Sequence, residues 1–170
     1  MDTSIPIVAL TMTASAVQHR ALPIARSAGR LGIPVHAVAV GRAGPTAASR
    51  YLQRPVTLPA DASEDQVRDA LLELGRRLGR SVLVPLEDAS TVFVDDNADA
   101  LSEYFAFPRR PPGTSRLLAS KRELHLLCER LGLPSPRAAF PADGAAALAE
   151  AGRLGYPVVA KRIDAWLVCN

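Results

Sequence analysis

Residues 120–162 read SKRELHLLCERLGLPSPRAAFPADGAAALAEAGRLGYPVVAKR. This segment contains the only two lysines of the chain, Lys121 and Lys161, although the chain has 20 basic residues in all. Arginine presents a rigid planar fork, whereas lysine is a compact charge on a flexible stem, which suits a phosphate held at one or two oxygens. The placement of both ammonium groups in one segment therefore favours a shared anionic ligand.

The first part of this segment predicts a helix followed by extended chain. Ser120 is a favourable N-cap, and Glu123 three residues later completes the pattern of a capping box, so Lys121 lies in the first turn. Leucines follow at helical spacing until Gly132, a residue type that commonly ends helices. Pro134 then favours an extended backbone.

The second part of the segment predicts another helix and then a strand. Asp143 can cap an alanine-rich helix that ends at Gly155. Residues 156–163 combine proline, valine and isoleucine in a pattern typical of a strand. Because side chains alternate along a strand, Lys161 shares one face with valine and isoleucine. An unpaired buried charge is costly, so Lys161 needs a partner, and a nucleotide phosphate would be one.

The run SKRELHLLCERLGLPSP … LGYPVVAKR resembles the opening of an ATP-grasp domain, the nucleotide-binding fold of carboxylate–amine and carboxylate–thiol ligases. In that family a helix with an early lysine leads through a Gly-hydrophobic-Pro-x-Pro turn to a strand that carries a second lysine. The resemblance implies that Lys121 and Lys161 approach the phosphates of ATP. The chain departs from the family pattern at Ser120, where the family has Asp or Asn, and at Arg162, where it has Pro.

The resemblance also implies a reaction, its cofactors and its small-molecule partners. In this family ATP phosphorylates a carboxylate, and an amine or other nucleophile then displaces phosphate from the acyl phosphate, with Mg²⁺ bridging the phosphate oxygens. The family's glycine-rich loop and its metal-binding carboxylates follow the second lysine, and here only residues 162–170 follow it. We therefore expect an N-terminal, truncated piece of a ligase that is inactive by itself and contains no catalytic or metal-binding residue.

The preceding residues predict an α/β fold with an open, mostly parallel sheet flanked by helices. Apolar runs rich in β-branched residues alternate with amphipathic helical stretches, which is the pattern of such sheets. The strands are predicted at 5–12, 34–40, 54–59, 81–86 and 105–108, and the clearest helices at 21–31 and 63–78. This part resembles the pre-ATP-grasp domain, which helps to hold the acceptor substrate. We expect that domain over 1–112 and an incomplete α+β ATP-grasp subdomain over 113–170.

Acidic residues follow the predicted strand 81–86, at the edge where open parallel sheets bind ligands. Glu87 and Asp88 come directly after it, and Asp88 is a candidate substrate-binding residue. Three further acids on the next helical stretch are interpreted as a solvated or capping set, because no histidine accompanies them; these are Asp95, Asp96 and Asp99. Residues 11–15 lack the spaced glycines of a dinucleotide-binding turn.

Composition narrows the remaining possibilities. The net charge is +3 and the basic residues are scattered, which does not indicate a nucleic-acid surface. No apolar stretch approaches the roughly 20 residues that span a bilayer, and the N-terminus lacks the pattern of a signal peptide. The two cysteines, Cys128 and Cys169, are placed in a way that suggests a reducing compartment. We expect a cytoplasmic protein.

Two other functions remain open. The chain could be a non-catalytic binding module or subunit, with the apolar end Trp166–Val168 as its contact with a partner or with a second copy. It could also be a different nucleotide-using Rossmann-like enzyme that binds its ligand at the loop Gly41–Pro45, whose glycines could surround an anion.

Overall fold

The computed structural model describes residues 2–13, 20–41 and 44–164 of the 170-residue chain. Its contacts divide the described residues into two compact units, which we call unit 1, up to Pro112, and unit 2, residues 113–164. We describe each unit by itself. None of the helices in the described ranges combines the length and the apolar character that a membrane-spanning helix requires.

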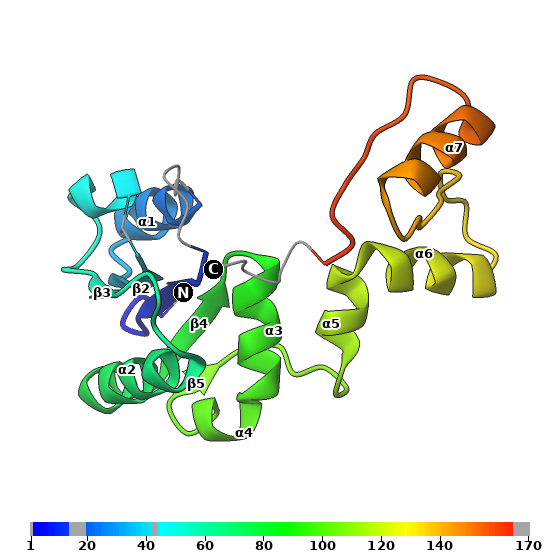
Figure 1. Cartoon of the computed structure of the whole chain (residues 1–170). Coiled ribbons are helices and arrows are strands. Elements are labelled where there is room, and N and C mark those ends of the chain that lie inside the picture. The colour runs from blue at the N-terminus through cyan, green and yellow to red at the C-terminus, as the bar shows by residue number, and fades with distance from the viewer. Residues whose placement is uncertain (1, 14–19, 42–43, 165–170) are drawn as a thin grey trace. The chain divides into compact units, whose positions relative to one another are not determined.

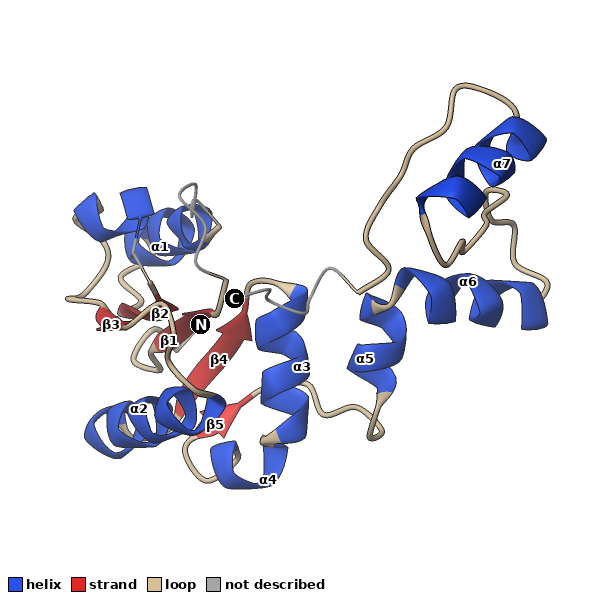
Figure 2. Ribbon diagram, viewed as in Figure 1, coloured by secondary structure: helices blue, strands red, loops and turns tan. Residues whose placement is uncertain are grey.

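Unit 1 contains a five-stranded sheet in which every neighbouring pair of strands is parallel (Figure 2). The strand order is β3-β2-β1-β4-β5, so β1 and β4 lie at the centre. Each strand falls within its predicted range: β1 Ile7–Thr11, β2 Val35–Val40, β3 Val56–Leu58, β4 Ser81–Pro85 and β5 Phe105–Ala106. The prediction of an α/β fold with an open parallel sheet is confirmed.

Helices cover the two faces of this sheet, with α1 on one side and α2 on the other (Figure 1). The main core lies on the α2 face, where even-numbered residues of β1 and β2 meet three helices, α2 (Glu64–Leu78), α3 (Asp88–Asp96) and α4 (Ala98–Leu101). Its buried residues include Val8, Leu10, Val38, Leu71, Leu83, Phe93 and Phe105. On the opposite face α1 (Ala21–Arg30) packs through small residues, Ala25 and Ala28, against Val35.

The longest helix, α2, follows its sequence signals closely. Ser63 caps it, because its side chain accepts a hydrogen bond from the N–H of Gln66, whose own side chain accepts one from Ser63 N–H. Gly75 is buried in the last turns, and a Cβ added there would lie 2.6 Å from Cβ of Tyr104. The absence of a side chain at Gly75 therefore lets α2 approach the residue that precedes β5.

We expect His36 to make the stability of the protein depend on pH. His36 lies on β2, on the α2 face, where burial lowers the pKa of its side chain below the ordinary 6.5 and the positive charge of Arg77 lowers the pKa further. The folded protein therefore keeps the imidazole neutral where the unfolded chain already takes up a proton, so stability falls as the pH drops through 6.5. Denaturant unfolding at about pH 7.5 and about pH 5.5 measures how much the free energy of unfolding falls between the two pH values. This fall should be smaller in His36→Gln than in the wild type. Equal losses would show that His36 is not the group responsible.

The described part of unit 2 contains three helices, α5 (Thr114–Ala119), α6 (Lys121–Arg130) and α7 (Gly144–Leu154). The prediction that Asp143 caps the last helix is confirmed, because its carboxylate accepts a hydrogen bond of 2.8 Å from the N–H of Ala146. The predicted capping box at Ser120 is wrong. Ser120 occupies the N-cap position of α6 but makes no capping hydrogen bond through its side chain, and Lys121 N–H donates to the carbonyl of Ile163 at 2.9 Å.

The predicted strand over 156–163 is also wrong, because this stretch has no strand pairing. Strands need a neighbour for their backbone N–H and C=O groups, and the described part of unit 2 offers no other strand. The apolar side chains of this stretch stay outside, with Tyr156 73% and Val159 80% exposed. Neither α6 nor α7 contains a buried residue. The described part of unit 2 therefore has secondary structure but almost no hydrophobic core.

Candidate functional site

The two candidate phosphate-binding lysines are connected through the start of α6. Lys121 is the first residue of this helix, and its Nζ donates to the carbonyl oxygen of Ala119 at 3.2 Å. Lys161 is exposed on the extended stretch after α7. The hydrogen bond from Lys121 N–H to Ile163 returns that stretch to the beginning of α6. The backbone segments that carry these lysines, 40 residues apart in sequence, therefore meet at the start of α6, and contact of the lysines with phosphate stays a prediction.

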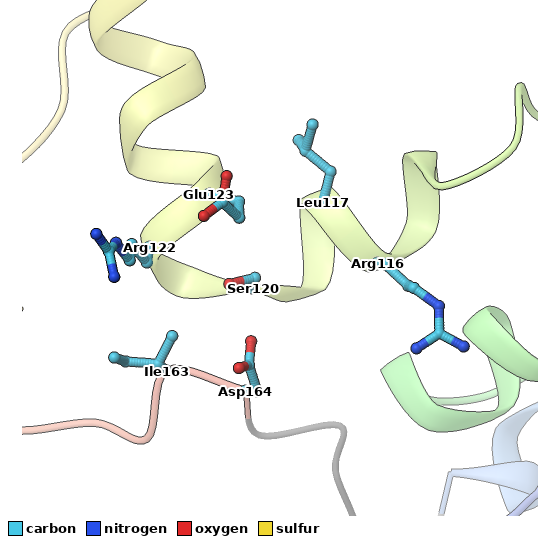
Figure 3. Close-up of a pocket in the computed structure, with 7 residues that line it drawn as sticks. All are labelled: Arg116, Leu117, Ser120, Arg122, Glu123, Ile163 and Asp164. Atoms are coloured by element: carbon cyan, nitrogen blue, oxygen red, sulfur yellow. The ribbon is translucent and has the colours of Figure 1, made fainter.

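A hollow of about 490 Å³ lies beside this region, between α5, the start of α6 and the returning stretch (Figure 3). It is lined by Arg116, Leu117, Ser120, Arg122, Glu123, Ile163 and Asp164. Neither lysine is among these lining residues. Two guanidinium groups and two carboxylates contribute equal and opposite charge, so the hollow by itself is not a strongly positive phosphate site.

The residues of this region fit only part of a magnesium–nucleotide complex. The lysines have the chemistry to contact phosphate oxygens, and the start of α6 adds the positive end of a helix dipole. Magnesium is held by several oxygen ligands, chiefly carboxylates together with substrate phosphates. Among the described residues no group of three or more His, Cys, Asp or Glu side chains is arranged to hold a metal ion.

The two acidic residues after β4, Glu87 and Asp88, differ in exposure and in hydrogen-bond partners. Asp88, the candidate substrate residue, is the first residue of α3 and is exposed. The side chain of Glu87 is only 7% exposed. Its Oε1 atom accepts hydrogen bonds from the N–H groups of Met12 at 2.5 Å and Thr13 at 2.6 Å, and its Oε2 lies 3.2 Å from Nη1 of Arg20. The partners are up to 75 residues earlier in the chain, so local pattern could not identify Glu87 as the residue that joins two loops.

The acids further along α3 and α4 pair with the segment that ends unit 1. Asp95 lies 3.2 Å from Arg110, and Asp99 lies 2.8 Å from Arg109. These ion pairs attach the arginines to the helices, which is a structural role. Of the alternative loop Gly41–Pro45, residues 42 and 43 lie outside the described residues, and Gly44–Ala48 forms the short helix η1.

Comparisons with known proteins give matches of structure. No protein-family model matches the sequence, and no curated protein matches it either. An L-amino acid ligase from Bacillus licheniformis is similar in structure, with a TM-score of 0.63 and 20% sequence identity. That match covers 96% of this chain and 38% of the ligase chain.

Two biotin carboxylase domains are also similar. One belongs to a single-chain bacterial carboxylase, with a TM-score of 0.51, 24% identity, and coverage of 87% of this chain and 34% of that chain. The other belongs to the 2-oxoglutarate carboxylase of Hydrogenobacter thermophilus, whose structure holds MgADP, ADP and bicarbonate, with a TM-score of 0.51 and 17% identity. It covers 89% of this chain and 33% of that chain, so the present chain spans little more than a third of any of these structures.

The present chain therefore shares its fold with these three structures over most of its length, which agrees with the fold that the sequence resemblance implied.

Proposed function

We propose that this chain is part of an ATP-dependent carboxylate–amine ligase that works through an acyl phosphate. The observation that carries the proposal is the combination of the fold shared with an L-amino acid ligase and the lysine-bearing motif whose two ends meet at α6. In this reaction a carboxylate oxygen attacks the γ-phosphorus of ATP and ADP leaves. The amine nitrogen then attacks the acyl carbon, the new C–N bond forms, and phosphate leaves with the former carboxylate oxygen.

Each unit has a role in this proposal. Residues 1–112 act as the pre-ATP-grasp domain, and exposed Asp88 at the carboxyl edge of the sheet contacts the carboxylate or amine substrate. Residues 113–170 form the beginning of the nucleotide-binding domain. Lys121 and Lys161 contact the phosphates of ATP, and a bound Mg²⁺ would supply further neutralisation of phosphate charge.

The chain by itself should not catalyse the ligation. Phosphoryl transfer to a carboxylate depends on stabilisation of charge by metal ions and several positioned donors, whereas the proposed site offers two lysines. Purified chain mixed with ATP, Mg²⁺ and a set of amino acids should therefore release no ADP above the buffer control. Steady, enzyme-dependent formation of amide and ADP would contradict this expectation.

We expect the isolated chain to bind ATP weakly and through both lysines. A hydrogen bond to a charged group contributes about 1.5–3 kcal/mol, so two such contacts correspond to a Kd on the order of 1 mM. Lys121→Ala and Lys161→Ala should each raise the Kd by about 10-fold or more, since 1.4 kcal/mol is a factor of ten. Isothermal titration calorimetry at low salt measures this change.

A matched control for these two variants is Arg130→Ala, which removes one positive charge at the other end of α6. It should leave the ATP affinity nearly unchanged, because exposed charges separated by more than a Debye length of about 10 Å are largely screened. Equal weakening by all three substitutions would mean that ATP responds only to net charge and that the lysines form no site.

The apolar surface of unit 2 suggests that it contacts further polypeptide. Large apolar side chains are exposed on and after the helices, including Leu148 at 71% and Val159 at 80%. Such surfaces commonly mark contacts with another polypeptide. We assign this surface to the remainder of a ligase fold, because the chain spans 38% of the ligase that it matches. The contact predicted for Trp166–Val168 lies outside the described residues.

A further inference from the structure

A buried carboxylate lies at the carboxyl ends of the two central strands of the unit 1 sheet, β1 and β4. Glu87 follows β4, and its side chain is 7% exposed. Its Oε1 accepts hydrogen bonds from two consecutive backbone N–H groups, those of Met12 and Thr13, at 2.5 and 2.6 Å. The guanidinium group of Arg20 reaches Oε2 at 3.2 Å. All of these donors belong to the segment that follows β1.

These donors are of the kind that binds a free anion. Successive backbone N–H groups directed at one point form a concave arrangement that attracts negative charge, and a guanidinium group adds a charge-assisted hydrogen bond. The nine-residue helix α3 begins directly after Glu87, so the positive end of its dipole also favours an anion here. The structure places the carboxylate of Glu87 among these donors.

The position of the carboxylate in the fold is the usual position of a ligand. From β1 the chain proceeds to β2 on one side of the sheet, and from β4 it proceeds to β5 on the other side. Open parallel sheets bind ligands in the crevice at this point, outside the carboxyl ends of the strands. Glu87 therefore occupies the place where a phosphate or carboxylate of a small molecule would otherwise meet the amide donors.

We propose that Glu87 is a built-in ligand that fills an anion-binding position and so excludes phosphate and carboxylate groups of small molecules from the N–H groups of Met12 and Thr13. A free anion would have to compete with a carboxylate that is tethered at its site and therefore present at high effective concentration. Glu87 thus keeps free phosphate groups away from these two amides and from Arg20, while Asp88 at the same edge stays exposed. This inference concerns unit 1 alone and does not depend on the ligase proposal.

The test removes the tethered carboxylate and offers a free one. Glu87→Ala leaves the N–H groups of Met12 and Thr13 and the side chain of Arg20 in the protein. Sodium formate should raise the midpoint of thermal unfolding of this variant and slow the hydrogen exchange of both amides, whereas sodium chloride at equal ionic strength should do neither. Inorganic phosphate should bind the variant at least about 10-fold more tightly than it binds the wild type.

Two further variants keep the test decisive. In Glu87→Gln the side chain has the same shape without the charge, so this variant should fold. The amides of Met12 and Thr13 should exchange more slowly in it than in Glu87→Ala, and formate should not change its thermal unfolding. Glu73→Ala removes an exposed carboxylate of α2 that pairs with Arg76, and it should not respond to formate either.

Three outcomes would overturn the inference. The first is that formate and chloride act alike on Glu87→Ala. The second is that the wild type binds phosphate at Met12 and Thr13. The third is that both amides exchange in Glu87→Gln at the same rate as in the wild type. This third outcome decides the question if Glu87→Ala does not fold.

Discussion

Replacing Phe93 with alanine should lower the free energy of unfolding of unit 1 by about 3–5 kcal/mol. Phe93 lies on α3, is 1% exposed, and belongs to the main core beneath the central strands. Truncation of a buried aromatic side chain loses its transfer free energy and leaves a cavity that the sheet can only partly close. Because a domain is stable by about 5–15 kcal/mol, this single change removes a large fraction of the total. Chemical denaturation followed by circular dichroism measures it.

The matched control for this variant is Leu148→Ala, the removal of a large apolar side chain from α7. Leu148 is 71% exposed, so its truncation should change the free energy of unfolding by no more than about 0.5 kcal/mol. A similar loss in both variants would contradict the division into a unit with a core and a unit without one.

Hydrogen exchange should show the same division across the whole backbone. Amides of β1 and β4 lie at the centre of the sheet and exchange only when unit 1 unfolds, whereas α6 and α7 have no buried residue to hold them closed. We expect protection in the two strands to exceed that in the two helices by at least about 1000-fold, which corresponds to about 4 kcal/mol. Mass spectrometry of peptic peptides measures the difference, and comparable protection in both units would show that unit 2 has a core of its own.

The sheet of unit 1 could be predicted because its signals are local. Each strand is a short apolar run, and the longest helix, α2, has its own cap at Ser63. Strand ends were predicted less well, since β3 spans only Val56–Leu58 within a predicted range of six residues, 54–59. The end of a strand depends on where its neighbour stops, and that information lies in a different part of the sequence.

The errors in unit 2 have the same physical origin. Residues 156–163 carry a strand pattern, but a strand forms only when another strand accepts its hydrogen bonds, and the described residues of unit 2 contain none. Ser120 has the sequence of a capping box, yet its N–H, which the Glu123 side chain would accept in such a box, donates to the carbonyl of Arg116 at the end of α5. In both cases the outcome depends on hydrogen-bond partners outside the local pattern.

Residue type alone identified part of the candidate sites. The rarity of lysine identified Lys121 and Lys161, and the structure brings the segments that carry them together at the start of α6. At the sheet edge the sequence drew attention to Asp88, whereas the residue with the most specific surroundings is its neighbour Glu87. The difference depends on the amides of Met12 and Thr13, whose proximity follows from the pairing of β1 with β4.

The central claim is that the start of α6 and the stretch that returns to it form the phosphate-binding region of a ligase. The most direct measurement is a titration of isotopically labelled chain with ATP, followed residue by residue in amide NMR spectra. The account predicts that the shifts concentrate at residues 120–124 and 160–164 and disappear in Lys121→Ala. Shifts confined to the carboxyl edge of the unit 1 sheet, or shifts that persist unchanged in Lys121→Ala, would contradict it.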